Sequence, residues 1–167
     1  FKERADYMIS IAKKELDDKV LTDNNNVKKI IKRVPFGIGV IIPAWNYPYL
    51  ITANSLIPSL IAGNTVIFKG SSQTPSVGII LKETMDETLE DMEETDLKSI
   101  FSNLILDHKD TQYLVRHKDV KYINFTGSVE GGKQILKSSM ENGFKSVTLE
   151  LGGKDSAYVC DNANLKL

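Results

Sequence analysis

Five short, mostly apolar runs, each separated from the next by a segment with helical spacing, constrain the fold of this chain most strongly. The runs are rich in β-branched residues and lie at Phe36–Ile42, Thr65–Lys69, Ile100–Leu106, Val120–Phe125 and Ser146–Leu151. Short apolar runs of this kind are typical of strands that are buried on both faces. Strands that alternate with helices predict an α/β fold, in which an open parallel sheet is flanked by helices.

Two further segments make this prediction more specific. Tyr49–Ala62 has apolar residues on one broad helical face, but Pro58 inside it should kink or interrupt the helix. Beyond the fifth run, Ala157–Cys160 is predicted to be a sixth strand, in which Cys160 packs as a small apolar side chain.

The first 34 residues differ in character from the rest of the chain. Tyr7–Asp18 has the apolar spacing of a helix, whereas Val27–Val34 alternates weakly and carries four basic residues, as an edge strand or arm would. We therefore divide the chain into residues 1–34, a helix with a basic arm or edge strand, and residues 35–167, a single domain that contains the sheet.

Composition and charge exclude several classes of partner. The net charge is −1, and no aromatic residue is interleaved with the basic ones of Val27–Val34, so we expect no nucleic acid partner. Ile38–Gly63 is the most apolar window, but three prolines and two asparagines interrupt it, which argues against a membrane span. One cysteine excludes a disulfide framework and fits a cytoplasmic protein. Two histidines and one cysteine offer no usual metal-ligand cluster.

Polar side chains follow four of the predicted strands. They lie at Trp45–Asn46, Lys69–Ser72, Thr126–Ser128 and Glu150. In open parallel sheets, ligands bind at the carboxyl ends of the strands. The sequence therefore predicts that these four groups form one binding site.

Glu150 is the candidate general base. It ends an apolar run and precedes Leu151 and the pair Gly152 and Gly153, so we expect it at the buried end of a strand. Burial disfavours a carboxylate anion and would prepare this side chain to accept a proton. The alternative is a surface glutamate at a strand end before a glycine turn.

The other three groups also have a functional and a structural interpretation. Asn46 could donate to a developing oxyanion, or it could stabilise its own turn. Lys69 could bind ribose hydroxyls or a phosphate, or its aliphatic chain could simply extend to solvent. Ser128 could contact a pyrophosphate at a helix start, with Gly131 and Gly132 allowing close approach, or it could cap that helix.

Four motifs taken in order resemble one family. They are PAWNYP (Pro43–Pro48), AGNTVIFK (Ala62–Lys69), FTGS (Phe125–Ser128) and LELGGK (Leu149–Lys154). Together they resemble the NAD(P)-dependent aldehyde dehydrogenase superfamily in its cofactor-binding region. The resemblance extends from about Arg33 to the end of the chain. It implies a Rossmann-like NAD(P)-binding domain, incomplete in this chain, from a parent enzyme that is a homo-oligomer.

The resemblance also implies a reaction and the residues that serve it. In this family a cysteine thiolate attacks a small-molecule aldehyde, hydride passes to NAD or NADP, and water hydrolyses the resulting thioester to a carboxylic acid. By resemblance, Asn46 holds the oxyanion and Glu150 activates the water as a general base. Lys69 binds the adenosine ribose, and Ser128 contacts the pyrophosphate. The other implied cofactor-binding residues are Ile42, Pro43, Trp45, Ser72, Gly127, Gly132 and Leu151.

One departure from the family pattern concerns the choice of cofactor. Members that favour NAD often carry an acidic residue three positions after the lysine, where it grips the ribose diol. Ser72 stands at that position and has no charge to repel a 2′-phosphate. We therefore expect that NADP is tolerated or preferred.

A second departure concerns the nucleophile. The cysteine of the family lies well beyond the glutamate, and Cys160, the single cysteine here, has no activating neighbour. We expect a fragment that ends before the domain with the catalytic cysteine and that is inactive alone. The alternatives are a non-catalytic nucleotide-binding remnant or interaction module without the nucleophile, and a purely structural α/β domain.

Overall fold

The computed structural model describes residues 1–24 and 27–164 and has the predicted alternation of strands and helices. The helices are α1 (Lys2–Leu16), α2 (Pro48–Ile61), α3 (Pro75–Asp91), α4 (His108–Arg116) and α5 (Val129–Ser139), with a 3-10 helix, η1 (Thr95–Ile100), after α3. The strands are β1 (Lys19–Asp23), β2 (Lys28–Ile31), β3 (Ile38–Ile42), β4 (Thr65–Phe68), β5 (Phe101–Asn103), β6 (Val120–Thr126) and β7 (Ser146–Glu150). Each of the five predicted apolar runs contains one strand of the main sheet.

The main sheet has five parallel strands in the order β5-β4-β3-β6-β7. β3 and β6 are neighbours in the middle of the sheet, and the chain proceeds from them toward opposite edges. Where the order of the strands reverses in this way, a crevice forms outside their carboxyl ends. The predicted fold class, an open parallel sheet flanked by helices, is confirmed.

Two hydrophobic cores lie on opposite faces of the sheet. On one face, Leu56 of α2 and Val77 of α3 pack against β3, β4 and β5. On the other face, Val115 of α4 and Ile135 of α5 pack against β3 and β6. β3 contributes to both cores, with Val40 and Ile41 no more than 1% exposed on its two faces, which explains its continuous apolar run.

Of the two predicted effects of Pro58, a kink or an interruption of the helix, the structure rules out the interruption. α2 runs from Pro48 to Ile61 through this residue, and the N–H of Ala62 donates to the Pro58 carbonyl oxygen at 3.1 Å. The burial of Ala53 and Leu56 against the sheet stabilises the helix despite the missing proline N–H.

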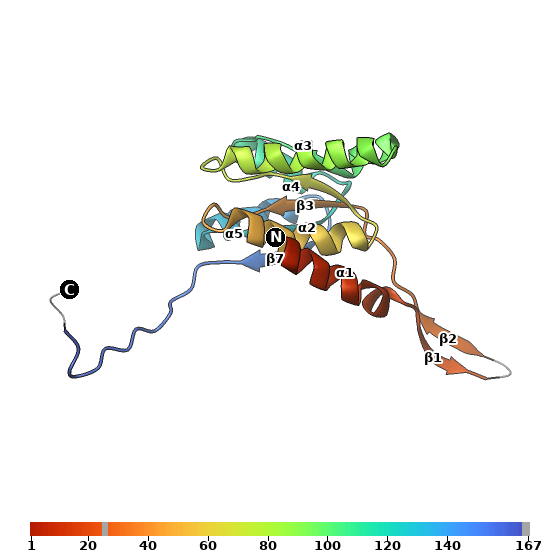
Figure 1. The fold of residues 1–167 in the computed structure, drawn as a ribbon, viewed down its shortest axis with the longest axis horizontal. Helices are drawn as coiled ribbons and strands as arrows, with labels where there is room; N and C mark the ends of the chain where they lie inside the picture. The colour runs from red at the N-terminus through yellow and green to blue at the C-terminus, as the bar shows by residue number, and fades with distance from the viewer. Residues whose placement is uncertain (25–26, 165–167) are drawn as a thin grey trace.

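The predicted strand at residues 157–160 is absent, and the chain there is exposed and has no regular structure. Tyr158 is 91% exposed, and Cys160 is also exposed rather than packed. After Glu150 the chain leaves the sheet (Figure 1), so these residues have no neighbouring strand with which to pair. The apolar character of a short run was not sufficient to make a strand.

The first 34 residues form a helix and a two-stranded antiparallel hairpin of β1 and β2. α1 packs against α2, and the hairpin projects from the body of the molecule (Figure 1). Val20, Leu21, Ile30 and Ile31 on the hairpin are 45–55% exposed. The division of the chain between residues 34 and 35 remains a prediction. None of the described helices has the length and apolarity required to cross a membrane.

Candidate active site and cofactor cleft

A cleft of about 620 Å³ lies at the carboxyl ends of β3, β4, β6 and β7. Most of the predicted site residues line it, namely Ile42, Pro43, Trp45, Asn46, Lys69, Ser72, Gly127, Ser128, Glu150 and Leu151. Gly132 is the one that does not line it. Side chains from four strand ends thus meet at one place, as expected where the strand order reverses.

Lys69 follows β4 and brings a partly dehydrated cation to the cleft. Its backbone N–H donates to the Ile41 carbonyl oxygen at 2.9 Å, which continues the pairing of β4 with β3. The residue is 9% exposed, and burial lowers the pKa of its ammonium below the ordinary value of 10.5. No described residue pairs with this ammonium, which is therefore available to an anionic or hydroxyl-bearing ligand.

Ser128 occupies the N-cap of α5, where its Oγ accepts a hydrogen bond from the Gly131 N–H at 3.0 Å. The capping interpretation of this residue is therefore correct. The same hydroxyl lines the cleft and keeps its own proton for a ligand. The N–H groups and the dipole at the start of α5 favour an anion at this position.

The glycines near α5 allow close packing beneath the cleft. A Cβ atom on Gly127 would lie 2.7 Å from Cζ of Phe125, and one on Gly132 would lie 2.5 Å from Cδ2 of Leu151. Gly132 is buried and packs against Leu151, which lines the cleft. Its predicted contact with the cofactor remains a prediction. The Gly127 N–H also donates to the Glu150 carbonyl oxygen at 3.0 Å and fixes the α5 turn to the end of β7.

Glu150 is the last residue of β7, and its side chain is exposed rather than buried. The predicted burial is wrong because β7 is an edge strand and α5 packs on its opposite face. Val147 and Leu149 point toward that face and are half-buried. The carboxylate lines the cleft from the side that lacks a helix, where it is open to water.

Asn46 and Trp45 lie in the turn between β3 and α2, and both are exposed. The Asn46 Oδ1 atom accepts a hydrogen bond from the Tyr47 N–H at 3.1 Å, as the turn-stabilising interpretation predicts. That bond orients the amide, whose Nδ2 donates to no described residue. One side chain thus stabilises the turn and keeps a free donor in the cleft.

Sequence reasoning missed several residues that line the cleft. They include Ile51 of α2, Gln73 in the loop after β4, and His108 at the start of α4. His108 could have been found from its position, because it begins the helix after β5 and so lies at the same edge of the sheet. Ile51 carries no such signal, since it is one of many apolar residues in its helix.

The arrangement suits an extended, phosphate-bearing ligand. A partly buried cation at Lys69 and a helix N-terminus at Ser128 offer two sites for negative charge. Asn46 and Glu150, an amide donor and a carboxylate, lie in the same cleft. Its volume falls within the range of about 300–1,000 Å³ for small-molecule sites.

Comparison with known proteins identifies relatives along nearly the whole chain. The model of the aldehyde dehydrogenase family matches residues 2–167. A mitochondrial aldehyde dehydrogenase of Leishmania tarentolae is 38% identical over 146 residues, which cover 86% of this chain and 28% of the relative. The 4,4'-diaponeurosporen-aldehyde dehydrogenase of Staphylococcus aureus is 35% identical, over 95% of this chain and 34% of the relative.

Solved structures show the same relationship. Succinic semialdehyde dehydrogenase from Streptococcus pyogenes, in complex with NADP+, has a TM-score of 0.80 and 25% identity. The match covers 96% of this chain and 34% of that one. The chain thus spans about a third of the length of the relatives that it matches. On its sequence motifs, its parallel sheet and these matches, the chain belongs to the aldehyde dehydrogenase family.

Proposed function

We propose that this chain forms the NAD(P)-binding part of an enzyme that oxidises a small-molecule aldehyde to a carboxylic acid. The main support is the convergence of Lys69, Ser128, Asn46 and Glu150 on one cleft at the carboxyl ends of parallel strands. Membership of the family points to the same chemistry. Because the chain spans about a third of its relatives, the proposed activity is that of the whole enzyme.

The cofactor-binding role rests on charge and on hydrogen-bond donors. The Lys69 ammonium would bind the adenosine ribose or its phosphate, because folding has removed much of its water and left it unpaired. The N-terminus of α5 and the Ser128 hydroxyl would hold the pyrophosphate. A streptococcal relative solved with NADP+ supports this class of cofactor.

The catalytic role rests on Asn46 and Glu150. The free Asn46 Nδ2 would donate to the oxyanion that develops when a cysteine thiolate attacks the aldehyde carbonyl. The Glu150 carboxylate would take a proton from the water that hydrolyses the thioester. When bound, the nicotinamide supplies the hydride acceptor. Cys160 lies outside the cleft in an exposed segment, so we assign the nucleophile to another part of the enzyme.

We further propose that NADP is accepted at least as well as NAD. Ser72 lines the cleft beyond Lys69 and brings no carboxylate that would repel a 2′-phosphate. The cytoplasmic location and the homo-oligomeric assembly of the parent enzyme remain predictions from its sequence and its family.

Calorimetric titration with NADP and NAD tests the proposal. The unmodified chain should bind NADP, and Ser72→Glu should weaken NADP binding by about tenfold through charge repulsion. The same substitution should not weaken NAD binding and should strengthen it if the new carboxylate accepts hydrogen bonds from the ribose diol. Ser76→Glu adds the same charge to an exposed position of α3 outside the cleft and should leave both affinities unchanged. Absence of saturable binding of either dinucleotide would refute the proposed function. A strong preference for NAD would refute only the choice of NADP.

A further inference from the structure

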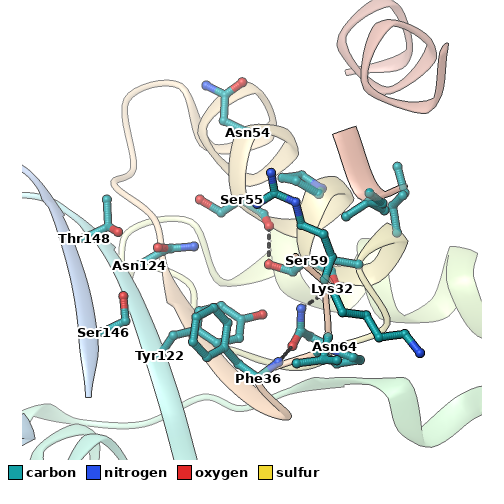
Figure 2. A pocket seen from close by; sticks show the side chains of 17 residues that line it. Lys32, Phe36, Asn54, Ser55, Ser59, Asn64, Tyr122, Asn124, Ser146 and Thr148 are labelled. Carbon is teal, nitrogen blue, oxygen red and sulfur yellow. Dashed lines mark hydrogen bonds between the residues drawn. The ribbon is translucent and has the colours of Figure 1, made fainter. Parts of the chain in front are cut away.

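A second cavity, of about 760 Å³, lies between α2 and the face of β6 and β7 that α4 and α5 do not cover. Figure 2 shows Ser55 and Ser59 of α2 on one side, and Tyr122, Asn124, Ser146 and Thr148 of the two strands on the other. It shares no lining residue with the cofactor cleft. The cavity and the cofactor cleft are therefore separate sites.

Tyr122 carries a buried polar atom without a partner at this cavity. The residue is 8% exposed, and its hydroxyl makes no hydrogen bond to any described residue. The ring packs over Gly39, where a Cβ atom would lie 1.9 Å from Cζ, and against the ring of Phe36, 6.0 Å away between centroids. These contacts position the Tyr122 ring over β3 and direct its hydroxyl to this cavity.

The Tyr122 hydroxyl is a hydrogen-bond donor with no acceptor among the described residues. Burial raises the pKa of this phenol and outweighs the opposite effect of the nearby Ser59 hydroxyl, so the group keeps its proton. Ser59 does not make a hydrogen bond with it, and its own Oγ donates to the Ser55 carbonyl oxygen at 2.6 Å. A buried donor without a protein partner is rare in folded proteins and calls for an acceptor from outside the chain, such as a water molecule or a ligand.

The rest of the wall has the chemistry of an anion site. Lys32 and Arg33 lie at the exposed rim, and the described lining residues include no carboxylate. Asn124 and Thr148 add an amide and a hydroxyl from the sheet. Phe36 supplies an apolar surface beside them.

We propose that this cavity binds a small organic anion, a carboxylate attached to a compact apolar body. The Tyr122 hydroxyl donates to the carboxylate, Lys32 and Arg33 balance its charge from the rim, and the apolar body packs against Phe36. A hydrogen bond to a charged acceptor is stronger than one between neutral groups. The site is separate from the proposed dinucleotide cleft and does not depend on it.

Titration of the whole 167-residue chain with benzoate, followed by amide NMR, tests this proposal. Saturable shifts should map to the amides of residues that line the cavity. Tyr122→Phe keeps the ring and removes a hydroxyl that has no partner, so it should fold normally and bind benzoate about tenfold more weakly. Tyr113→Phe removes an exposed hydroxyl from α4, outside the cavity, and is the matched control.

Three further measurements test the role of the ligand's charge and the separation of this cavity from the cofactor cleft. Benzyl alcohol, which lacks the charge, should bind much more weakly than benzoate, and the double variant Lys32→Gln/Arg33→Gln should reduce this difference. NADP should not displace benzoate, because the two sites share no residue. Absence of saturable shifts, equal binding by Tyr122→Phe, or displacement by NADP would each overturn the proposal. None of these results would bear on whether the cleft binds NADP.

Discussion

Lys69 is the residue of the cofactor cleft whose pKa is lowered by folding. Its side chain is largely buried, its ammonium is partly dehydrated, and no described residue pairs with that charge. Burial therefore lowers its pKa, and a bound phosphate would stabilise the protonated form. Ligand binding and protonation of this side chain are thus linked.

This linkage predicts how the affinity for NADP depends on pH. Affinity should fall as the pH rises through the lowered pKa of Lys69, at a less alkaline pH than the 10.5 of an ordinary lysine. Calorimetric titration across this range should show the decline in the unmodified chain. Lys69→Met should bind NADP weakly and lack this decline. Lys137→Met, which removes the same charge from an exposed position of α5, should behave as the unmodified chain does.

The stability of the free chain should depend on pH in the opposite direction to its affinity for NADP, which provides an internal control. Unfolded chains bind a proton at residue 69 more tightly than the folded chain does, so the contribution of Lys69 to stability increases as the pH rises. A loss of binding with rising pH therefore cannot result from this residue unfolding the chain. If Lys69→Met retained the alkaline decline, another group would be responsible.

At single positions, sequence alone could predict which residues gather but not how deeply they are buried. Lys69 and Asn46 follow apolar strands, and that position is enough to place them at the cleft. The exposure of Glu150 could not be predicted, because it depends on which helices cover the last strand. Cys160 was mispredicted for a related reason, since burial of a short run requires a partner strand.

Among the elements, the junction between β3 and α2 depends on Asn64, a buried residue just before β4. Its Oδ1 accepts hydrogen bonds from the N–H groups of Phe36 and Gly37 at 2.7 and 3.0 Å. Its Nδ2 donates to the Ser59 carbonyl oxygen in the last turns of α2, at 3.1 Å. One amide therefore connects the segment before β3 to the end of the helix that follows it.

Replacing this amide should weaken the junction. Asn64→Ala leaves two backbone N–H groups without acceptors, so the free energy of unfolding should fall by about 1–3 kcal/mol. Urea denaturation followed by circular dichroism measures the change. Asn142→Ala removes a single hydrogen bond from an exposed asparagine to the Arg116 carbonyl oxygen and should cost well under about 1 kcal/mol. Equal effects of the two substitutions would show that Asn64 has no special role.

Elements with strong local signals were predictable, and those that depend on distant partners were not. The five strands of the sheet lie in mostly apolar runs, and the most continuous of them, β3, is the one that is buried on both faces. Lys28–Ile31 was expected as a strand, but its partner β1 was not, because Lys19–Asp23 has no clear pattern. α2 tolerates Pro58 because its packing against the sheet outweighs a local propensity.

For the whole molecule, the described chain contains a cofactor cleft without a thiol. Cys160 is its single cysteine and lies in the exposed segment after β7, away from the residues that line the cleft. We therefore expect the 167-residue chain to bind dinucleotide without oxidising aldehydes. The absorbance of the reduced cofactor, followed with a panel of short aldehydes, should not increase.

A Cys160→Ser variant tests whether Cys160 could serve as the nucleophile. It should bind NADP as the unmodified chain does, and neither protein should turn over aldehyde. Aldehyde-dependent reduction that disappears in the variant would identify Cys160 as the nucleophile and contradict our assignment.

The cleft takes residues from strands that are synthesised at different times, so it can form only late during synthesis of the described chain. β3, β4 and β5 leave the ribosome before β6 and β7 and share one core with α2 and α3, so we expect Lys69 to be in place early. Ser128 and Glu150 belong to β6, α5 and β7, which emerge later and must pair along the other side of β3. We therefore expect a nascent chain to complete its first core before the proposed dinucleotide site exists, and a bound dinucleotide to stabilise the chain only after β7 has paired.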